Sequence, residues 1–332
     1  MKNGTYEAYV AREVGEGQYA GNVEERKVAD LPAGDVLIRV RYSSLNYKDA
    51  LSARGNRGVT RRYPHTPGID AAGIVEQSVV DDFAPGDAVV VSGDGFGTNR
   101  PGGFGQYVRV PEKWVMKLTP GQTLRESMIL GTAGFTAGLC IHEMIPTVKP
   151  EDGDILVTGA TGGVGCAAVG ILAKLGYSVV AVSSKDDAAK LLEPLGAKEI
   201  MSREEFVKGA GRALLQMSWA GVVDTVGGDI LATAIKSTYP RGVVTCCGNA
   251  ASPDLPLTVY PFILRGVKLA GIAAQHYDPS TRQLILDKLA HEWRLDQLEA
   301  IYTEIPLVEL DAKITQMIEG RHTGRTVVRL DG

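Results

Sequence analysis

In the stretch VTGATGGVG, from Val157 to Gly165, glycines without side chains follow the largely apolar run DILV at 154–157. A strand that becomes a helix through bare glycine backbone is a setting in which main-chain N–H groups, helped by the helix dipole, bind a pyrophosphate. Gly162 lets the main chain approach the phosphates, and Gly165 lets the helix lie close on the sheet. Because Ala160 takes the first glycine position of the G-x-G-x-x-G pattern, a structural turn without ligand is the alternative.

The segments around this stretch alternate between short β-branched runs and longer amphipathic ones, from about residue 130 to 303. The predicted strands are 154–159, 178–184, 221–228, 242–249 and 267–272, and the predicted helices are 163–176, 186–197 and 229–239. Continuous apolar strands separated by helices are typical of a parallel sheet covered on both faces. The pattern predicts an α/β, doubly wound Rossmann domain that binds a dinucleotide.

The residues after the second predicted strand indicate which dinucleotide. An NAD site usually carries an Asp or Glu there, which holds the ribose 2′-OH. This strand instead ends in Ser183, Ser184 and Lys185, and Arg203 follows the next short strand. Hydroxyls and positive groups favour a 2′-phosphate, which a carboxylate would repel. We therefore expect NADP(H), although Lys185 is alternatively a solvated surface residue.

The first 125 residues or so have a different pattern. Short alternating runs, punctuated by Gly and Pro, predict an antiparallel barrel or sandwich: DVLIRVRYSSL, AGIVEQSV, DAVVVSG and GQYVRV. The tail GRTVVRL at 324–330 reads as a lone strand that returns to this N-terminal domain. With 332 residues the chain is long enough for two domains, and we expect a ligand cleft between them.

Composition excludes several classes of protein. A formal net charge of −4 gives no reason to expect nucleic acid or a membrane as partner. No apolar run reaches the ~18 residues of a transmembrane helix, and the N-terminus has no signal core. Four cysteines without C-x-x-C spacing read as small buried residues in a reducing compartment. A soluble cytoplasmic protein that acts on a small molecule is expected.

Motifs along essentially the whole chain resemble those of the medium-chain dehydrogenase/reductase superfamily: SLNYKDAL, PGIDAAG, PGDAVVV, GTAGFTAG, VTGATGGVG and VDTVGG. The resemblance implies a GroES-like β-barrel catalytic domain, at residues 1–128 and 304–332, and an NADP-binding Rossmann domain at 129–303. Zinc-containing members carry a Cys in the first motif and a His-Glu pair in the second, where this chain has Asn46, Tyr47, Ile69 and Asp70. Because catalytic zinc takes three protein ligands, we expect no metal, and hence an activated C=C bond or a quinone as acceptor.

Within the zinc-independent members the chain looks most like the acrylyl-CoA reductase group, often labelled quinone oxidoreductase. SSLNYKDAL, GTAGFTA, WAGVVDTVGG and TVYPFILRGVKLAGI carry this likeness. It implies NADPH-dependent reduction of acrylyl-CoA to propionyl-CoA. It also implies cofactor contacts from Tyr47, Thr161, Gly162, Gly163, Val164, Ser183, Ser184, Lys185 and Arg203, and contacts near the nicotinamide from Asn249, Ile263 and Ala274. Some members have an Asn where this chain has Gly320, so that contact is not expected here.

The expected reaction develops negative charge on the thioester oxygen, which hydrogen-bond donors would stabilise. Asn46 and Tyr47 follow a barrel strand and are the candidate catalytic residues. Tyr47 alternatively holds the nicotinamide ring, and Asn46 is alternatively a buried turn amide. Asp70 either orients its neighbours or is a structural turn residue.

The loop ARGNRGVTRRYPHTPG at 53–68 carries four arginines, of which Arg61 and Arg62 are candidate substrate contacts. Coenzyme A has a 3′-phosphate and a pyrophosphate that guanidinium groups bind well. A solvated basic loop is the alternative, and His65 is expected to be structural rather than a general acid.

The segment LTVYPFILRGVKLAG at 257–271 combines aromatic residues with a strand at the sheet edge and predicts a homodimer formed by edge-to-edge sheet extension. Three functions fit the sequence: an acrylyl-CoA (2-enoyl thioester) reductase, a quinone or enone reductase without need of CoA, and a non-catalytic NADPH-binding protein.

Overall fold

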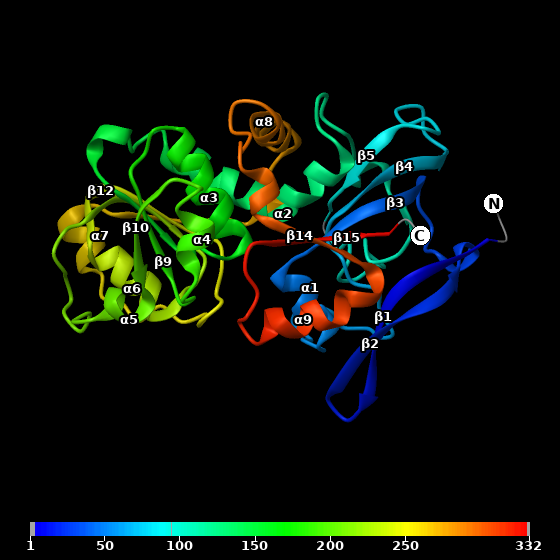
Figure 1. The fold of residues 1–332 in the computed structure, drawn as a ribbon, viewed down its shortest axis with the longest axis horizontal. Helices are drawn as coiled ribbons and strands as arrows, with labels where there is room; N and C mark the ends of the chain where they lie inside the picture. Colours follow the sequence, from blue (N-terminus) through cyan, green and yellow to red (C-terminus); the bar gives the residue numbers. More distant parts are fainter. Residues whose placement is uncertain (1–3, 94, 331–332) are drawn as a thin grey trace. The chain divides into compact units, whose positions relative to one another are not determined.

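The computed structural model describes residues 4–93 and 95–330, and the chain divides into two compact units. Unit 1 consists of residues 1–132 and 302–332, and unit 2 of residues 133–301 (Figure 1). The sequence analysis set these divisions after residues 128 and 303. In the described residues no helix combines the length and apolarity needed to cross a membrane.

Unit 1 is built around one seven-stranded sheet of order β14-β15-β3-β4-β5-β7, with β6 paired to β3. All its pairs are antiparallel except β14 with β15. Its strands are β3 (Val36–Leu45), β4 (Ala71–Ser78), β5 (Ala88–Val91), β6 (Tyr107–Val110), β7 (Val115–Lys117), β14 (Tyr302–Pro306) and β15 (Arg325–Arg329). The predicted antiparallel runs are confirmed. The tail strand is not alone, because β15 pairs with both β14 and β3.

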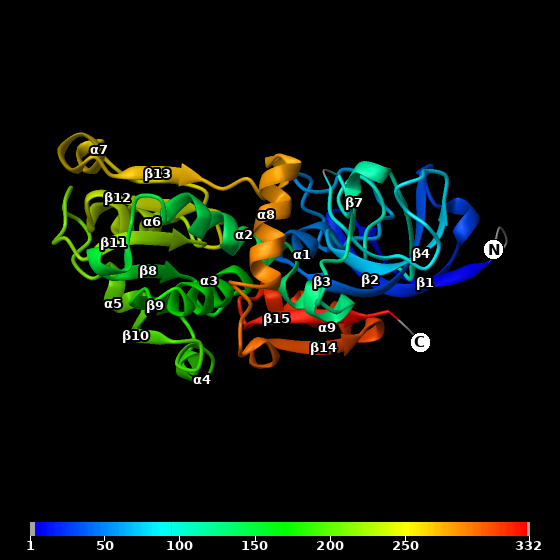
Figure 2. The same ribbon diagram turned by 90° about the horizontal axis from the view of Figure 1, so that it is seen from above.

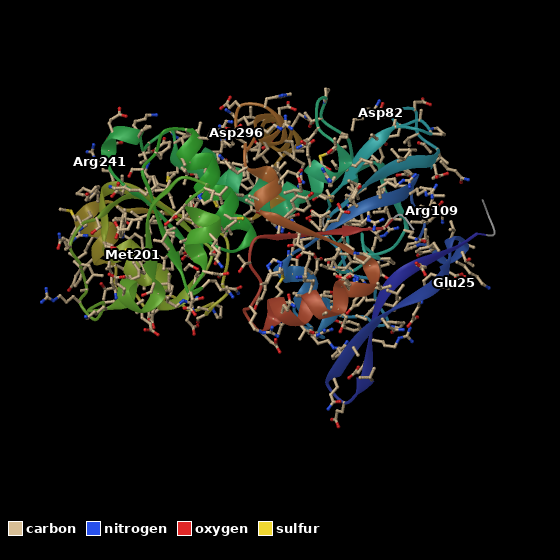
Figure 3. The ribbon with its side chains drawn as sticks, viewed as in Figure 1. Glu25, Asp82, Arg109, Met201, Arg241 and Asp296 are labelled. Carbon is tan, nitrogen blue, oxygen red and sulfur yellow. The ribbon has the colours of Figure 1, made fainter. Side chains whose placement is uncertain are left out.

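A hairpin of β1 (Thr5–Gly15) and β2 (Gln18–Lys27) forms a separate two-stranded sheet on unit 1. It is attached to the rest of the unit by bridges from Ala8 to Gly105 and from Ala11 to His65. Side chains of the sheet, the hairpin and the helices α1 (Tyr47–Ala53) and α9 (Leu310–Ile318) share one apolar core. Charged residues such as Glu25 of β2 and Asp82 lie on the outside of the unit (Figure 3).

Unit 2 is a six-stranded parallel sheet of order β10-β9-β8-β11-β12-β13 (Figure 2), as the sequence predicts. Its strands are β8 (Ile155–Thr158), β9 (Val179–Ser183), β10 (Ala197–Ser202), β11 (Trp219–Asp224), β12 (Thr238–Cys246) and β13 (Lys268–Gly271). Its helices are α3 (Gly163–Lys174), α4 (Ala188–Leu192), α5 (Arg203–Val207), α6 (Gly228–Lys236), α7 (Tyr260–Arg265), α8 (Pro279–Ala290) and the second half of α2 (Leu124–Met144).

Both faces of the sheet are covered at its centre, and the central strands β8, β9 and β11 are buried at every position. Leu156, Val222 and Val244 pack on one face with Ile230 and Leu231 of α6. Gly221 and its partner Ile155 point the other way, and Gly221 lies against Met144 of α2 on the opposite face. The predicted helix 186–197 is shorter than expected, because Pro194 and Gly196 do not continue a helix beyond Leu192.

Candidate active site

The glycine-rich turn of unit 2 lies at the carboxyl end of β8 and leads into α3. Gly162 is the N-cap of α3, in extended backbone with φ −78° and ψ 170°, and no side chain caps the first turn. A Cβ atom on Gly162 would meet only the carbonyl oxygen of Gly159, at 3.2 Å. Thr161, Gly163 and Val164 complete the turn. The N-terminal N–H groups of α3 are thus open to an anion over Gly162.

Gly165 holds this turn close to its helix. A Cβ atom here would lie 2.4 Å from the oxygen of Gly159 and 2.6 Å from Cα of Ala160, both of them backbone atoms. The helix therefore approaches the strand end more closely than any side chain would allow. This is the role that the sequence analysis gave to Gly165, and it fixes the position of the N–H groups above.

Ser183, at the carboxyl end of the neighbouring strand β9, is linked directly to the glycine-rich turn. Its Oγ lies 2.9 Å from Oγ1 of Thr161 and accepts a hydrogen bond from the N–H of Lys185 at 3.1 Å. Ser183 is buried, Ser184 is exposed and Lys185 is half-buried. The nearest acidic residues in sequence, Asp186 and Asp187, belong to the turn before α4. The strand end itself presents hydroxyls and an ammonium group.

Arg203 joins this group through the register of the sheet. Ser202, the last residue of β10, pairs with Ser183 of β9, so Arg203 and Ser184 leave adjacent strands at the same level. Arg203 is exposed at the first position of α5. The backbones of Ser184 and Arg203 therefore lie side by side at the strand ends, and the hydroxyl, ammonium and guanidinium groups of this region suit a phosphate better than a hydroxyl.

The two residues expected near the nicotinamide, Asn249 and Ala274, follow the carboxyl ends of β12 and β13 and thus lie at the same edge of the sheet. Ile263 does not. It lies on α7, which leads into the amino end of β13 (Figure 2). Arg265 of α7 donates to the carbonyl oxygens of Lys236, at the end of α6, and Thr238, at the start of β12. The structure thus separates Ile263 from the other expected cofactor contacts.

The sequence analysis assigned no role to Asp224, which is buried at the end of β11. It accepts hydrogen bonds from Thr158 Oγ1 at 2.6 Å and from the N–H of Gly227 at 2.9 Å. Burial raises the pKa of this carboxyl group. Asp224 ties the ends of β8 and β11 together under the edge that carries the glycine-rich turn. The motif VDTVGG was the available signal, since an Asp directly after an apolar strand is seldom left without partners.

In unit 1 the candidate catalytic residues lie where β3 turns into α1. Asn46 is the N-cap of α1 and forms a capping box with Asp49, and Tyr47 is the first residue of the helix. The side chain of Tyr47 is 41% exposed, whereas Asn46 is 8% exposed. No hydrogen bond to the Tyr47 hydroxyl group is found among the described residues. Tyr47 can therefore meet a ligand, and Asn46 belongs to the interior.

The amide of Asn46 is held by a buried network centred on Asp70. Asn46 Nδ2 donates to Asp70 Oδ2 at 2.8 Å, and Ser44 Oγ donates to the same oxygen at 2.7 Å. Thr132 adds its N–H to Oδ2 at 3.0 Å and its hydroxyl to Oδ1 at 2.6 Å. Gly131 allows this approach, with φ 48° in the kink of α2; a Cβ there would lie 2.7 Å from Asp70 Oδ2.

The remaining atoms of the Asn46 amide also have partners. Nδ2 lies 3.2 Å from Asp49 Oδ2, and Oδ1 accepts from Arg325 Nη1 at 3.2 Å. Arg325, on β15, is buried and also donates to the carbonyl oxygens of Ile129 and Leu45. Asn46 therefore has no N–H group left for a substrate, and the alternative of a buried turn amide describes it better than a direct catalytic role.

Asp49 is a fully buried carboxyl group beside this network. It accepts from the N–H groups of Asn46, Gly68 and Ile69 at 2.9, 3.1 and 2.8 Å. Burial, followed by the nearby Asp70 carboxylate, raises the pKa of Asp49 to about 7. The sequence analysis gave Asp49 no role, although an Asp three residues after an Asn is the sequence signal of a capping box.

These residues do not fit a catalytic zinc ion. Among the described residues no group of three or more His, Cys, Asp or Glu side chains is arranged to hold a metal. Both oxygens of Asp70 already accept hydrogen bonds, and its neighbours are an amide and hydroxyls rather than thiolate or imidazole. The hydrogen-bond network involves the motifs SLNYKDAL and PGIDAAG. In the superfamily that these motifs resemble, zinc-containing members carry a Cys in the first motif and a His-Glu pair in the second.

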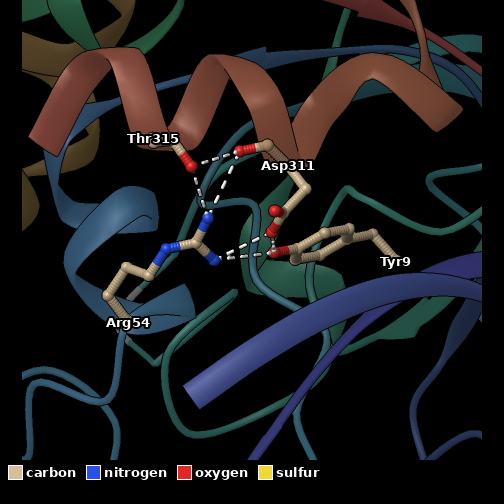
Figure 4. Close-up of polar contacts among 4 residues, drawn as sticks. All are labelled: Tyr9, Arg54, Asp311 and Thr315. Carbon is tan, nitrogen blue, oxygen red and sulfur yellow. Dashed lines mark hydrogen bonds and ion pairs between the residues drawn. The ribbon is translucent and has the colours of Figure 1, made fainter. Parts of the chain in front are cut away.

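The four arginines of the basic loop in unit 1 differ in their contacts. Arg54 reaches from the end of α1 to α9, where it bonds Asp311 at 2.8 Å and Thr315 at 2.9 Å, and Tyr9 donates to the same Asp311 carboxylate at 2.6 Å (Figure 4). Arg57 pairs with Glu13 at 3.2 Å. Arg61 and Arg62 are exposed, and no ion pair of either is found among the described residues. Only these last two are free to bind a ligand.

Each of the two units matches a known protein family. Residues 32–120 match the family described as "Alcohol dehydrogenase GroES-like domain", and residues 163–291 match "Zinc-binding dehydrogenase". The acrylyl-CoA reductase AcuI of Ruegeria pomeroyi is 39% identical over 94% of this chain and 95% of its own. The protein named "Putative quinone oxidoreductase YhfP" of Bacillus subtilis is 40% identical over 93% and 94%.

Two crystal structures superpose on nearly the whole chain. The yhdH oxidoreductase of Salmonella enterica, in complex with NADP, and the Bacillus subtilis protein yhfP, with NAD bound, each have a TM-score of 0.94 and 39% identity. Each match covers 98% of this chain and 100% of the other. The matched folds and relatives agree with the resemblance drawn from the motifs.

Proposed function

The chain belongs to the medium-chain dehydrogenase/reductase superfamily, in its acrylyl-CoA reductase group, and we propose that it reduces the C=C bond of acrylyl-CoA, a 2-enoyl thioester, to propionyl-CoA with NADPH. The observation that carries the proposal is the carboxylate-free strand end at Ser183–Lys185, beside Arg203, in a chain 39% identical to an acrylyl-CoA reductase. When bound, NADPH supplies the hydride that goes to the β-carbon, and the α-carbon takes a proton.

The residues expected to hold NADPH are those gathered at the carboxyl edge of β8–β10. The turn Thr161–Val164 and the first N–H groups of α3 would bind the pyrophosphate. Ser183, Ser184, Lys185 and Arg203 would bind the 2′-phosphate. Asn249 and Ala274, which follow β12 and β13, remain candidates for the nicotinamide half. Ile263 is not part of this proposal, because it lies on α7 at the amino end of β13.

Tyr47 is the proposed catalytic residue. Its phenol is an exposed donor at the start of α1, and a hydrogen bond to the thioester oxygen would stabilise the charge that develops there. Asn46 is a positioning residue. Its amide links Asp70 to Asp49 and Arg325 and fixes the turn from which Tyr47 projects.

NADPH oxidation measured side by side with acrylyl-CoA, crotonyl-CoA and a benzoquinone tests this function. We expect kcat/KM to be highest for acrylyl-CoA. Turnover of benzoquinone alone would replace the proposal by a quinone reductase. If NADPH binds but none of the acceptors is reduced, the protein is a non-catalytic NADPH-binding protein.

A quinone or enone reductase is the second candidate function. It is favoured by the 40% identity to YhfP, whose name describes a quinone oxidoreductase. An electron-poor quinone needs no Lewis acid and no contact with CoA phosphates, so the Tyr47 site would serve it equally. The unpaired Arg61 and Arg62 favour the CoA thioester over this acceptor.

We also propose that the protein is a homodimer that extends the unit 2 sheet across β13. On its outer side β13 has no partner strand among the described residues, and α7 beside it exposes a group of large apolar side chains. These are Val259, Tyr260, Ile263 and Leu264, with Leu269 on β13 itself. Exposed apolar surface next to an open strand edge favours association with a second copy.

All four cysteines are free, which suits the expected cytoplasmic location.

A further inference from the structure

Unit 1 contains a cavity of about 460 Å³ that brings Arg61 and Arg62 together with a third arginine from a distant part of the chain. Arg26 comes from β2, on the N-terminal hairpin, and the first two from the loop after α1. The cavity is lined by Val10, Arg26, Arg61, Arg62, Pro64, His65, Thr66, Thr98, Asn99 and Pro101. Nothing in the sequence linked the hairpin to the loop.

The charge of this cavity is not neutralised. None of the three arginines has an ion-pair partner among the described residues, whereas Arg54 and Arg57 of the same loop pair with Asp311 and Glu13. Among the residues that the structure describes, the lining contains no Asp or Glu. Three guanidinium groups without counter-charge form a strong site for an anion, and their fork geometry suits phosphate oxygens.

The other polar groups of the cavity are donors or neutral. Thr66 and Thr98 are 9% and 8% exposed, and no hydrogen bond of either hydroxyl group is found within the described part of the chain. His65 Nε2 lies 2.9 Å from the carbonyl oxygen of Gly97, and burial lowers the pKa of its imidazole. A volume of this size exceeds that of a single phosphate ion and lies in the range of nucleotide-sized ligands.

We propose that this arginine cavity binds the phosphorylated adenosine end of coenzyme A and so selects CoA thioesters over free acceptors. The inference rests on the proposed function. Thr66 at the cavity and Asp70 beneath Asn46 are four residues apart, hence at most about 14 Å along the chain. The pantetheine arm of CoA is long and flexible enough for a separation of this order, and the proposal requires one substrate to occupy the cavity and reach Tyr47.

The test compares two thioesters that differ only in the nucleotide. KM and kcat are measured with acrylyl-CoA and with acrylyl-pantetheine, for the wild type, Arg26→Gln and the double variant Arg61→Gln/Arg62→Gln. We expect the double variant to raise KM for acrylyl-CoA by tenfold or more, with kcat, KM for acrylyl-pantetheine and KM for NADPH unchanged. Arg329→Gln, at an exposed arginine of β15 paired with Glu304 and outside the cavity, is the control for the loss of a positive charge elsewhere on unit 1.

Direct binding separates this inference from the proposed reaction. Adenosine 3′,5′-bisphosphate is titrated calorimetrically into the wild-type enzyme, with inorganic phosphate as the comparison. We expect the bisphosphate to bind, to compete with acrylyl-CoA and to lose affinity in the double variant, while phosphate alone binds weakly. If the wild type bound the bisphosphate but turned over no acrylyl-CoA, the cavity would stand and the proposed function would fail.

Two results would overturn the inference. One is an equal rise in KM for both thioesters, which would mean that the arginines maintain the structure of the loop and do not bind the nucleotide. The other is phosphate binding as strong as that of the bisphosphate, without any effect on acrylyl-CoA. Thermal unfolding of each variant, compared with that of Arg329→Gln, shows whether the loop is still folded.

Discussion

Tyr47 and Asn46 are neighbours in sequence with opposite surroundings. The Asn46 amide is enclosed by Asp70, Asp49 and Arg325, whereas the Tyr47 ring projects from the first turn of α1. The sequence identified both as candidates, because donors after a barrel strand suit an oxyanion. It could not separate them, because two partners of Asn46 lie far along the chain: Asp70, directly before β4, and Arg325 on β15.

For Tyr47→Phe we expect kcat for acrylyl-CoA to fall by roughly 10²-fold, the usual cost of losing one donor to a developing oxyanion. The Kd for NADPH should change little, since the ring is kept. Steady-state kinetics and fluorescence titration measure the two quantities. Unchanged kcat and KM would remove Tyr47 from the mechanism.

The pH dependence of stability reports on Asp49. Its pKa in the folded chain, about 7, is above the ordinary value of 3.8, so the folded state holds this proton more tightly than the unfolded state. The corresponding stability is complete below about pH 4 and is lost as the pH rises through 7. In Asp49→Asn this loss is absent, so the free energy of unfolding of the wild type should fall relative to that of the variant between pH 4 and pH 7.

Urea unfolding at several pH values measures this difference. A difference that stayed constant, or that grew in favour of the wild type as the pH rose, would show that Asp49 is ionised throughout this range. The hydrogen bonds from Asn46, Gly68 and Ile69 would then outweigh its burial.

At the scale of elements, the sequence predicted the parallel strands of unit 2 and the strand–turn–helix at Val157–Gly165 well. These depend on local pattern, namely continuous apolar runs and glycines at fixed offsets. The sequence analysis missed the β1–β2 hairpin and β14. Most side chains of β2 are exposed or half-buried, so it shows no apolar run. β14 is stabilised by parallel pairing with β15 across a helix, which no local pattern reveals.

Gly162 allows the anion-binding role of α3 to be tested apart from its folding. Asp is a favourable N-cap, so Gly162→Asp should leave the melting temperature unchanged or raise it. The same carboxylate would repel a pyrophosphate, and we expect NADPH affinity to fall by about tenfold or more beyond that of Gly162→Asn. The Asn variant has nearly the same shape without the charge. Equal affinities of the two variants would mean that the pyrophosphate does not lie over this helix end.

For the whole molecule, composition and motif order sufficed to predict two domains and their classes. They did not predict which charges remain unpaired. Arg54 and Arg61 look equivalent in the sequence, yet α9 supplies Asp311 to the first, and the second has no carboxylate partner within the described residues. Arg26 joins the cavity from a segment that the sequence analysis left without any assignment. Such long-range pairings decide which residues of a basic loop are free to bind.

The proposed dimer is tested by Ile263→Glu/Leu264→Glu. Both side chains are more than 60% exposed in the single chain, at 67% and 63%, so the change should not disturb its fold. We expect the wild type to have the mass of two chains by light scattering, and the variant that of one. Leu284→Glu, on α8 and 43% exposed, is the control. A wild type that is monomeric at micromolar concentration would contradict the dimer.

The central claim is that a phosphorylated nicotinamide cofactor is selected by Ser183, Ser184, Lys185 and Arg203. The most direct test is the ratio of kcat/KM for NADPH to that for NADH, with acrylyl-CoA held at saturation. We expect NADPH to be favoured by tenfold or more, since each charge-assisted hydrogen bond to the 2′-phosphate contributes about 1.5–3 kcal/mol. Arg203→Gln together with Lys185→Gln should bring the ratio close to one. Equal use of NADH and NADPH by the wild type would contradict the account.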